Sequence, residues 1–337
     1  MDVIATIRKM PYYTERNARM IDAGVDAFRV KCSHVSIPEI SSALQAARQQ
    51  IDASGRQVKL LADLPEAKLR LGDFPQEQME VEKDVDFRFL HGPESSDPSA
   101  YIPFTTPALA QHLKIGDRFY IGDGHLELEV TDIHSPNEFI ARSVSNGTLT
   151  RRASITVPSL MDQLDHIVPE IDDIIAELPK SKPDLVSFSF VRNQAMLHTL
   201  MDKLLAVTTP QWRPMVIAKI ESAEGVKNVD EILEVCHGIM IARGDLALNI
   251  PFEQLGLIQK KLVAKARQAG KYVIVATGAL ESMLYTSMPS RAGILDVTNS
   301  CLDGASAIML CPETAHNKNP ERVVQVAHKI IAAVENP

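Results

Sequence analysis

Eight short apolar runs, most of them rich in valine and isoleucine, recur along this 337-residue chain, and stretches with helical periodicity separate most of them. Each run is apolar almost throughout, which is typical of strands that are covered on both faces of a parallel sheet. We predict strands at 2–7, 26–30, 58–63, 184–190, 215–220, 238–242, 272–276 and 306–310, and helices at 38–53, 193–206, 253–269 and 319–335. Eight strands that alternate with helices favour an α/β fold, a closed (β/α)8 TIM barrel of about 250 residues.

The interval between the third and fourth runs breaks this alternation, because it holds about 120 residues where one helix would suffice. Residues 125–130 alternate between apolar and polar side chains, as a half-exposed strand does, and they follow a Gly122-Asp123-Gly124 turn. Asn146-Gly147 further along is a signal for a β-hairpin. We therefore predict a small all-β domain inserted into the barrel. The predicted domains are 1–72 (first part of the barrel), 73–156 (inserted β lid domain) and 157–337 (second part of the barrel).

Composition and charge exclude several classes of function. The chain has 35 basic and 43 acidic side chains, a formal net charge of −8, and no basic stripe of the kind that binds DNA or RNA. No apolar run reaches the roughly 18 residues that a membrane span requires, and Met1-Asp2-Val3-Ile4 does not open a signal peptide. The four cysteines lack Cys-x-x-Cys spacing, which argues against a zinc site or a disulfide framework. We expect a cytoplasmic protein with no nucleic-acid or membrane partner.

Polar side chains lie at the carboxyl ends of several predicted strands, where barrel enzymes build their active sites. They are Arg29, Asp63, Ser189, Lys219, Glu221, the Arg243-Gly244-Asp245 run and Thr277. Lys219 and Glu221 project to the same side, because alternate residues of a strand share a face. Glu221 and Asp245 offer hard oxygen ligands from neighbouring strands, which suits Mg²⁺ or Mn²⁺. A lysine beside such a metal stabilises charge on a transferring phosphoryl group or on an enolate.

Each of these features also has a less specific interpretation. In one alternative, Lys219 and Glu221 form a solvated ion pair at the barrel rim, and in another, Arg243-Gly244-Asp245 is a simple turn. Ser33-His34 is typical of a pair that caps a helix. The functional interpretation depends on the convergence of the polar residues at one face of the barrel.

The segment from Val216 to Met309 closely resembles the pyruvate kinase family, and the likeness extends over nearly the whole chain. It is carried by Ala218-Lys219-Ile220-Glu221, Gly238-Ile239-Met240-Ile241-Ala242-Arg243-Gly244-Asp245-Leu246, Ala276-Thr277, Leu280-Glu281-Ser282-Met283, Ser290-Arg291-Ala292 and, just beyond the segment, Glu313-Thr314-Ala315. Upstream matches are Arg29, Ser33-His34 and Ser189-Phe190-Val191-Arg192.

The resemblance implies a barrel with an inserted β lid, and Mg²⁺- or Mn²⁺-dependent phosphoryl transfer between phosphoenolpyruvate, or a related enol phosphate, and ADP. The family's catalytic lysine, which stabilises the transition state, corresponds to Lys219, and its metal-binding acids correspond to Glu221 and Asp245. Substrate-binding positions correspond to Arg29, Lys219, Gly244, Asp245 and Thr277, and nucleotide-binding positions to His34 and Arg70. The resemblance also implies a glycolysis-related kinase that takes small molecules, including ATP or ADP, and forms homo-oligomers.

The positions that bind K⁺ in the family are altered here. The usual Asn, Ser, Asp and Thr correspond to Lys31, Ser33, Asp63 and Leu64, so two of the four oxygen ligands are missing. Lys68 stands where K⁺-dependent members carry Glu and where members that work without K⁺ carry Lys. We therefore expect that Lys68 or Lys31 supplies positive charge near Asp63 and that K⁺ is not required.

Further departures bear on substrates and regulation. Gly278-Ala279 replaces the Gln-Met pair that usually follows the threonine, which predicts room for a substrate bulkier than pyruvate. Arg151-Arg152-Ala153-Ser154 replaces Lys-Lys-Gly-Val on the nucleotide side, and Cys311-Pro312 replaces Ser-Gly. The sequence stops at Pro337, so we expect no C-terminal regulatory domain.

Two other classes of function are compatible with these residues. A metal-dependent lyase or hydrolase would act on a keto acid through an enolate and would need no nucleotide. The inserted lid argues against it, because a lid serves chiefly to keep water away from phosphoryl transfer. A non-catalytic binding protein is the second alternative, and the presence of Lys219, Glu221, Asp245 and Thr277 argues against it.

Overall fold

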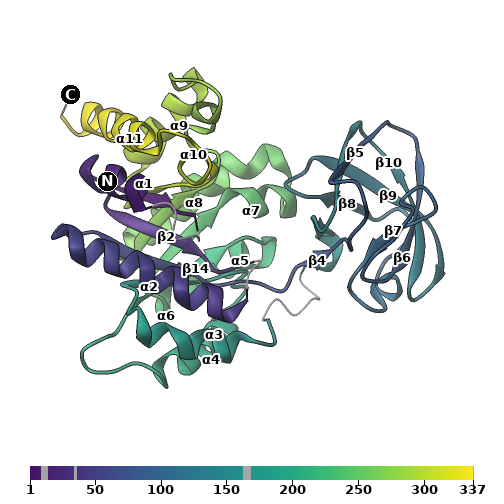
Figure 1. The fold of residues 1–337 in the computed structure, drawn as a ribbon, viewed down its shortest axis with the longest axis horizontal. Coiled ribbons are helices and arrows are strands. Elements are labelled where there is room, and N and C mark those ends of the chain that lie inside the picture. The colour runs from purple at the N-terminus through teal and green to yellow at the C-terminus, as the bar shows by residue number, and fades with distance from the viewer. Residues whose placement is uncertain (9–13, 34–35, 162–167, 337) are drawn as a thin grey trace. The chain divides into compact units, whose positions relative to one another are not determined.

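Eight parallel strands close into a barrel in the computed structural model, which describes residues 1–8, 14–33, 36–161 and 168–336 (Figure 1). Around the barrel the strands follow the order β1-β17-β16-β15-β14-β13-β3-β2. Their bounds are β1 Asp2–Thr6, β2 Ala27–Lys31, β3 Lys59–Asp63, β13 Leu185–Phe188, β14 Met215–Ile220, β15 Gly238–Ala242, β16 Tyr272–Ala276 and β17 Ala307–Leu310. The predicted (β/α)8 barrel is therefore confirmed. The fourth strand ends two residues before its predicted end, because Phe190 adopts a φ of +50° that extended backbone does not allow.

Helices cover the outer face of the barrel (Figure 1). Their bounds are α1 Thr14–Asp22, α2 Ile37–Ser54, α3 Ile171–Glu177, α4 Gln194–Leu205, α5 Ala223–Lys227, α6 Val229–Val235, α7 Arg243–Asn249, α8 Leu255–Gln268, α9 Arg291–Asp303, α10 Pro312–Ala315 and α11 Pro320–Glu335. Short 3₁₀ helices are η2 Leu109–Gln111, η3 Pro158–Leu160, η4 Leu178–Lys180, η5 Phe252–Gln254 and η6 Glu281–Leu284. The four helices predicted from periodicity appear as α2, α4, α8 and α11. Nowhere in the described ranges does a helix have the length and apolar character that a membrane span requires.

The inside of the barrel is filled by apolar side chains. Ile4, Leu61, Ile217, Met240 and Ile274 are buried and belong to one cluster. They come from five different strands, and alternate residues of each strand share the inward face. Because this cluster fills the middle of the barrel, inward-facing polar side chains are confined to the strand ends.

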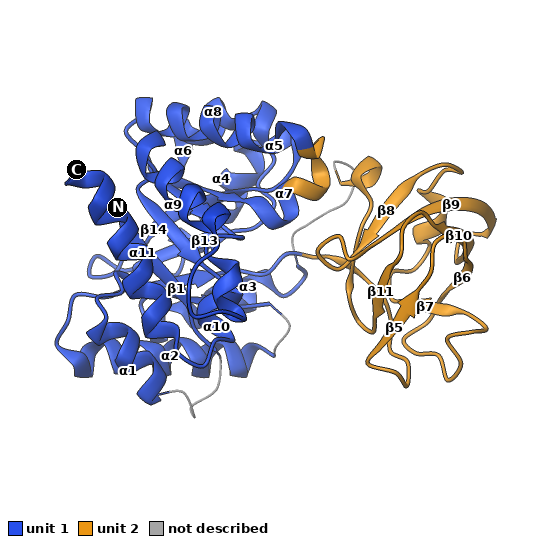
Figure 2. Cartoon of the chain, turned by 90° about the horizontal axis from the view of Figure 1, so that it is seen from above, with its two compact units in different colours: residues 1–66, 167–246, 253–337 blue, residues 67–166, 247–252 orange. Residues whose placement is uncertain are grey.

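The chain forms two compact units, which Figure 2 shows in different colours. The first holds the barrel and comprises residues 1–66, 167–246 and 253–337, and the second comprises residues 67–166 and 247–252. The second unit contains a seven-stranded sheet in the order β4-β12-β8-β9-β10-β6-β7 and a two-stranded sheet of β11 and β5. The bounds are β4 Leu69–Arg70, β5 Gln78–Val81, β6 Asp86–His91, β7 Ile102–Phe104, β8 Arg118–Ile121, β9 Leu126–Ser135, β10 Glu138–Ser143, β11 Gly147–Thr150 and β12 Ser154–Thr156.

Aromatic packing forms the core of the second unit. The rings of Phe89 and Phe139 stack with centroids 4.8 Å apart, and Phe119 meets Phe89 edge to face at 5.6 Å. The unit starts before residue 73, because β4 pairs with β12 and so draws residues 69–70 into the sheet.

Of the two glycine-containing turns predicted in this unit, one is present and the other is not. Gly122 and Gly124 adopt positive φ values of +64° and +88° between the paired strands β8 and β9, as their turn pattern predicts. The hairpin predicted at Asn146-Gly147 is wrong, because β10 pairs with β9 and β6, whereas β11 pairs with β5. Gly147 is needed instead for a close approach, since a Cβ there would lie 2.1 Å from the carbonyl oxygen of His125.

Candidate active site

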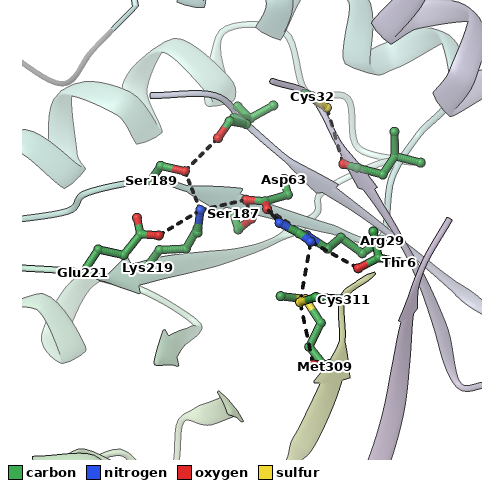
Figure 3. Close-up of polar contacts among 12 residues, drawn as sticks. Thr6, Arg29, Cys32, Asp63, Ser187, Ser189, Lys219, Glu221, Met309 and Cys311 are labelled. Carbon is green, nitrogen blue, oxygen red and sulfur yellow. Dashed lines mark hydrogen bonds and ion pairs between the residues drawn. The ribbon is translucent and has the colours of Figure 1, made fainter. Parts of the chain in front are cut away.

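A ring of polar residues and one thiol lies next to the apolar cluster, at the carboxyl ends of the strands. Thr6, Arg29, Asp63, Ser187, Lys219 and Cys311 each stand two positions after an apolar residue of that cluster, namely Ile4, Ala27, Leu61, Leu185, Ile217 and Met309. Because the strand period is two, these side chains share the inward face of the barrel. Figure 3 shows them pointing toward one another.

Asp63, at the end of β3, lies at the centre of this ring. Its Oδ2 accepts hydrogen bonds from Nε and Nη2 of Arg29, with Nε at 2.8 Å. Its Oδ1 accepts from the Ser187 hydroxyl at 2.7 Å and lies 3.3 Å from Nζ of Lys219. Asp63 is 2% exposed, so this carboxylate is an ion-pair partner for two cations away from water.

Lys219, in β14, is held by three oxygen atoms. Its Nζ donates to the Ser189 hydroxyl at 2.7 Å and lies 3.1 Å from Oε1 of Glu221, in addition to its contact with Asp63. Oε2 of Glu221 accepts from the backbone amide of Phe190 at 2.8 Å. The predicted common direction of Lys219 and Glu221 is confirmed. The solvated rim pair is wrong, because Lys219 is 5% exposed and Glu221 is 1% exposed.

Burial and charge together fix the protonation states of this network. Burial alone raises the pKa of Asp63, but the positive charges of Lys219 and Arg29 outweigh it and hold that pKa below its ordinary value. Burial alone lowers the pKa of Lys219, but the carboxylates of Asp63 and Glu221 outweigh it and raise that pKa. Lys219 is therefore an ammonium ion at neutral pH, which suits it to stabilise negative charge rather than to act as a base.

Arg29 extends the network toward β1 and β17. Its Nη1 donates to the Thr6 hydroxyl at 3.1 Å and lies 3.8 Å from Sγ of Cys311. Burial raises the pKa of the Cys311 thiol, so the sulfur is neutral at physiological pH. Arg29 is thereby fixed on two sides, by Asp63 and by Thr6, with its guanidinium inside the barrel mouth.

The Arg243-Gly244-Asp245 run opens α7 directly after β15. The alternative of a simple turn is therefore wrong, because these residues form the first helical turn. Gly244 lies against Thr277, since a Cβ on Gly244 would come 3.2 Å from the Thr277 methyl group. Thr277 follows β16 with a φ of +72°, an uncommon backbone conformation for a branched side chain.

The acids predicted to hold a divalent metal fit that role by their donor chemistry. Glu221 follows β14 and Asp245 lies in α7, and both offer only carboxylate oxygens, the ligands that Mg²⁺ and Mn²⁺ prefer. No group of three His, Cys, Asp or Glu side chains in the described part of the chain is placed to hold a metal by itself. Donors of this kind fit Mg²⁺, which usually binds one or two carboxylates together with substrate oxygens and water.

The remaining predicted positions belong to several elements, and one of them lies outside what can be described. Lys31 ends β2 and is paired in register with Asp63 of β3, whereas Lys68 and Arg70 belong to the second unit. Nη1 of Arg70 donates to the carbonyl of Arg152 at 3.3 Å. His34 lies outside the described residues.

The cap of α2 differs from the predicted Ser33-His34 pair. The helix begins after Ser36, whose amide and hydroxyl donate to Glu39 Oε2 at 2.8 and 2.7 Å, as in a capping box. Ser33 is buried and lies two residues after the end of β2.

Sequence reasoning missed three members of the ring, namely Thr6, Ser187 and Cys311. A signal for them was present. Each stands two residues after an apolar residue in a run that is otherwise apolar, which places it on the inward face one step beyond the core. Arg243 was predicted only as part of the polar Arg243-Gly244-Asp245 run at the end of a strand, and nothing in its spacing indicates the contacts described below.

Comparison with known proteins identifies similar sequences over almost the entire chain. The family described as pyruvate kinase, barrel domain, matches residues 1–324. A pyruvate kinase of Thermococcus litoralis is 33% identical over 337 residues, which cover 99% of this chain and 69% of that protein. A pyruvate kinase of Mycobacterium intracellulare is 33% identical over 338 residues, with 99% of this chain and 70% of that protein covered. One of Thermoplasma acidophilum is 30% identical, with 99% and 58% covered.

Proposed function

The chain belongs to the pyruvate kinase family and is a phosphotransferase, and we propose that it moves a phosphoryl group between phosphoenolpyruvate, or a related enol phosphate, and ADP. The observation that carries the proposal is the buried ammonium of Lys219, fixed by Asp63, Glu221 and Ser189 at the barrel mouth. A positive charge held in a site away from water stabilises developing negative charge without reorganising during the reaction.

Lys219 and Arg29 have complementary roles in this proposal. Lys219 neutralises charge on the phosphoryl group in transit and on the enolate oxygen that is left behind. Arg29 binds the substrate phosphate through its guanidinium, which is already oriented by Asp63 and Thr6. Asp63 touches both cations, so it sets their separation and direction before substrate arrives.

Glu221 and Asp245 would hold Mg²⁺ or Mn²⁺, which supplies further positive charge to phosphate and enolate oxygens when it is bound. Gly244, Asp245 and Thr277 complete the substrate side in the proposal. Gly244 is suited to this place because its lack of a side chain leaves room beside Thr277. Arg70 and His34 form the nucleotide side, and the second unit, which contains Arg70, is proposed to act as the lid.

K⁺ independence is part of the same proposal. Lys31 is paired in register with Asp63, so its ammonium belongs to the strand ends from which the family draws its K⁺ ligands. Leu64 is 1% exposed and offers no side-chain oxygen. Lys31 or Lys68 would supply a fixed positive charge in place of the ion.

A ³¹P-NMR assay with phosphoenolpyruvate, Mg²⁺ and a panel of nucleoside diphosphates tests this function. The proposal expects the phosphoenolpyruvate signal to fall as a nucleoside triphosphate signal rises in equal amount. Release of inorganic phosphate without a nucleotide would contradict kinase activity and support a hydrolase. Breakdown of a keto acid with Mg²⁺ alone would support the lyase alternative, in which Lys219 stabilises the enolate only.

A further inference from the structure

Thr277 is held in a backbone conformation that its own chemistry disfavours. It follows the buried end of β16 with a φ of +72°, and Gly278 continues the bend with a φ of +83°. Glycine adopts such φ values freely. In threonine they cost free energy, because the branched Cβ crowds the backbone. A residue of this kind keeps a positive φ only where its surroundings impose it.

The side chain of Arg243, the first residue after the neighbouring strand β15, supplies that constraint. β15 and β16 are paired in register at Ala242 and Ala276, so Arg243 and Thr277, which directly follow these two residues, are neighbours at the strand ends. Nε of Arg243 donates to the carbonyl oxygen of Ala276 at 3.1 Å and to that of Thr277 at 2.8 Å. Nη2 of Arg243 donates to the same Thr277 carbonyl. The guanidinium therefore fixes the peptide groups on both sides of the bend.

Asp296 in α9 and Gln259 in α8 hold Arg243 in turn. Oδ1 of Asp296 accepts from Nη1 at 2.6 Å and Oδ2 accepts from Nη2 at 2.8 Å, a bidentate pair, while Oε1 of Gln259 accepts from Nη1 at 3.2 Å. Together with the two carbonyl groups, these acceptors use all five N–H donors of the guanidinium. The Arg243 side chain is only 11% exposed, so water competes little for these bonds.

The constraint links the two substrate-side elements of the proposed site. Arg243 is the residue before Gly244-Asp245, and Gly244 packs against the methyl group of Thr277. We propose that Arg243 and Asp296 are positioning residues, which keep Thr277 in its strained conformation and in fixed register with Asp245. The inference rests on the proposed function for its effect on turnover, because it assigns Thr277 and Asp245 to the substrate side. Neither Arg243 nor Asp296 needs to touch the substrate in this role.

A double-mutant cycle tests the positioning role in the full-length protein. Asp296→Asn weakens the pair without removing volume, and we expect kcat to fall by about tenfold or more with KM within about threefold. Thr277→Ala removes the group that is positioned, so adding Asp296→Asn to it is expected to lower kcat by less than twofold further. Asp303→Asn on the same helix is the matched control, since it removes a pair between α9 and Lys260 of α8 that does not touch Thr277. Equal effects of Asp296→Asn in both backgrounds would overturn the proposal.

A structural readout keeps this inference separate from the proposed function. Crystal structures of Asp296→Asn and Arg243→Lys are expected to show Thr277 at a negative φ, with the Asp303→Asn structure unchanged. Lysine cannot reproduce five planar donors, so Arg243→Lys retains the charge and loses the geometry. If the wild-type protein transfers no phosphoryl group, the proposed function fails, while these structures still decide whether Arg243 and Asp296 impose the bend. A positive φ at Thr277 in both variants would overturn the inference.

Discussion

The barrel unit contains a buried network of charged side chains, whereas the ion pairs described in the second unit lie at its surface. In the barrel unit, Arg29, Asp63, Lys219 and Glu221 form one continuous network of ion pairs, and none of the four is more than 7% exposed. In the second unit, ion pairs such as Arg142 with Asp86 join side chains that are about half exposed. The same residue types therefore do different things in the two units.

This contrast separates the buried charges of the barrel unit, which we assign to function, from the exposed charges of the second unit, which keep that surface solvated. Exposed pairs on a β-sheet contribute little to stability, because water screens them and both side chains must be ordered. Burying charges costs free energy even when they are paired. Apolar side chains of similar volume at the same strand ends would therefore stabilise the barrel at least as well as the ion pairs do. We therefore propose that the buried network at the carboxyl ends of the barrel strands serves chemistry rather than stability.

Asp63→Asn tests most sharply whether the buried ion pairs of the barrel unit depend on one another. The change leaves two buried cations without their shared carboxylate, so we expect a loss of about 3 to 5 kcal/mol in the free energy of unfolding. Urea unfolding followed by fluorescence of Trp212, the single tryptophan of the chain, reports on the barrel unit. Asp86→Asn in the second unit is the control, and circular dichroism should show no measurable change for it. Equal stability losses in both variants would remove the distinction between the two units.

Glu313 provides a pH-dependent test within the barrel unit. Burial raises the pKa of this carboxyl group to about 7, so the folded protein binds a proton that the unfolded chain releases at the ordinary value of 4.5. Stability from this group is present below that ordinary value and is lost as the pH rises through 7, on the order of 3 kcal/mol in total. Glu313→Gln should flatten the unfolding profile between pH 5 and 8, measured through Trp212 fluorescence.

The control for Glu313 is Asp86→Asn in the second unit. A hydrogen bond from Arg142 lowers the pKa of Asp86, so its contribution is lost only on acidification below the usual aspartate range. The control should therefore leave the profile between pH 5 and 8 unchanged. A Glu313→Gln profile that still falls like the wild type would show that other groups cause the pH dependence.

Asp245→Asn tests a partly buried member of the proposed site. If Asp245 binds the metal, its replacement should weaken Mn²⁺ binding in the presence of phosphoenolpyruvate by about 100-fold, which electron paramagnetic resonance can measure. Asp132→Asn, which alters an exposed acid of the second unit, should leave Mn²⁺ affinity unchanged. Wild-type affinity in Asp245→Asn would contradict the assignment.

The smallest expected effect is the response to potassium. Activity in tetramethylammonium chloride should match activity in KCl at the same concentration, because Lys31 or Lys68 is proposed to replace the ion. Replacing both lysines with methionine should create a dependence on K⁺ or abolish activity. A tenfold activation of the wild type by K⁺ would refute this part of the proposal.

The sequence predicted the barrel well, because strands buried on both faces must be apolar almost throughout, and no other element leaves that pattern eight times. It also predicted that Lys219 and Glu221 share a face, since this follows from the strand period alone. Contacts between residues far apart in the chain could not be predicted from the sequence. Nothing local indicates that Asp63 pairs with both Arg29 and Lys219, which lie 34 and 156 positions away in the chain.

The two predicted turns also depend on residues that are distant in the chain, which the local sequence does not indicate. Asn146-Gly147 has the local preference of a hairpin, yet the approach of the distant His125 carbonyl explains the glycine. Likewise, Arg243-Gly244-Asp245 has the composition of a turn, but its helical geometry and the contacts of Arg243 with Asp296 and Thr277 depend on neighbouring elements of the barrel.

The most direct test of the central claim compares turnover and binding in Lys219→Met. In the proposed function, the buried ammonium of Lys219 acts on charge that develops during transfer. We therefore predict that kcat for phosphoryl transfer falls by at least ~100-fold while the Kd for phosphoenolpyruvate stays within a few-fold. Lys203→Met, which removes a surface lysine paired with Asp172, should leave kcat and Kd unchanged. Near-normal turnover in Lys219→Met would contradict this role of the lysine.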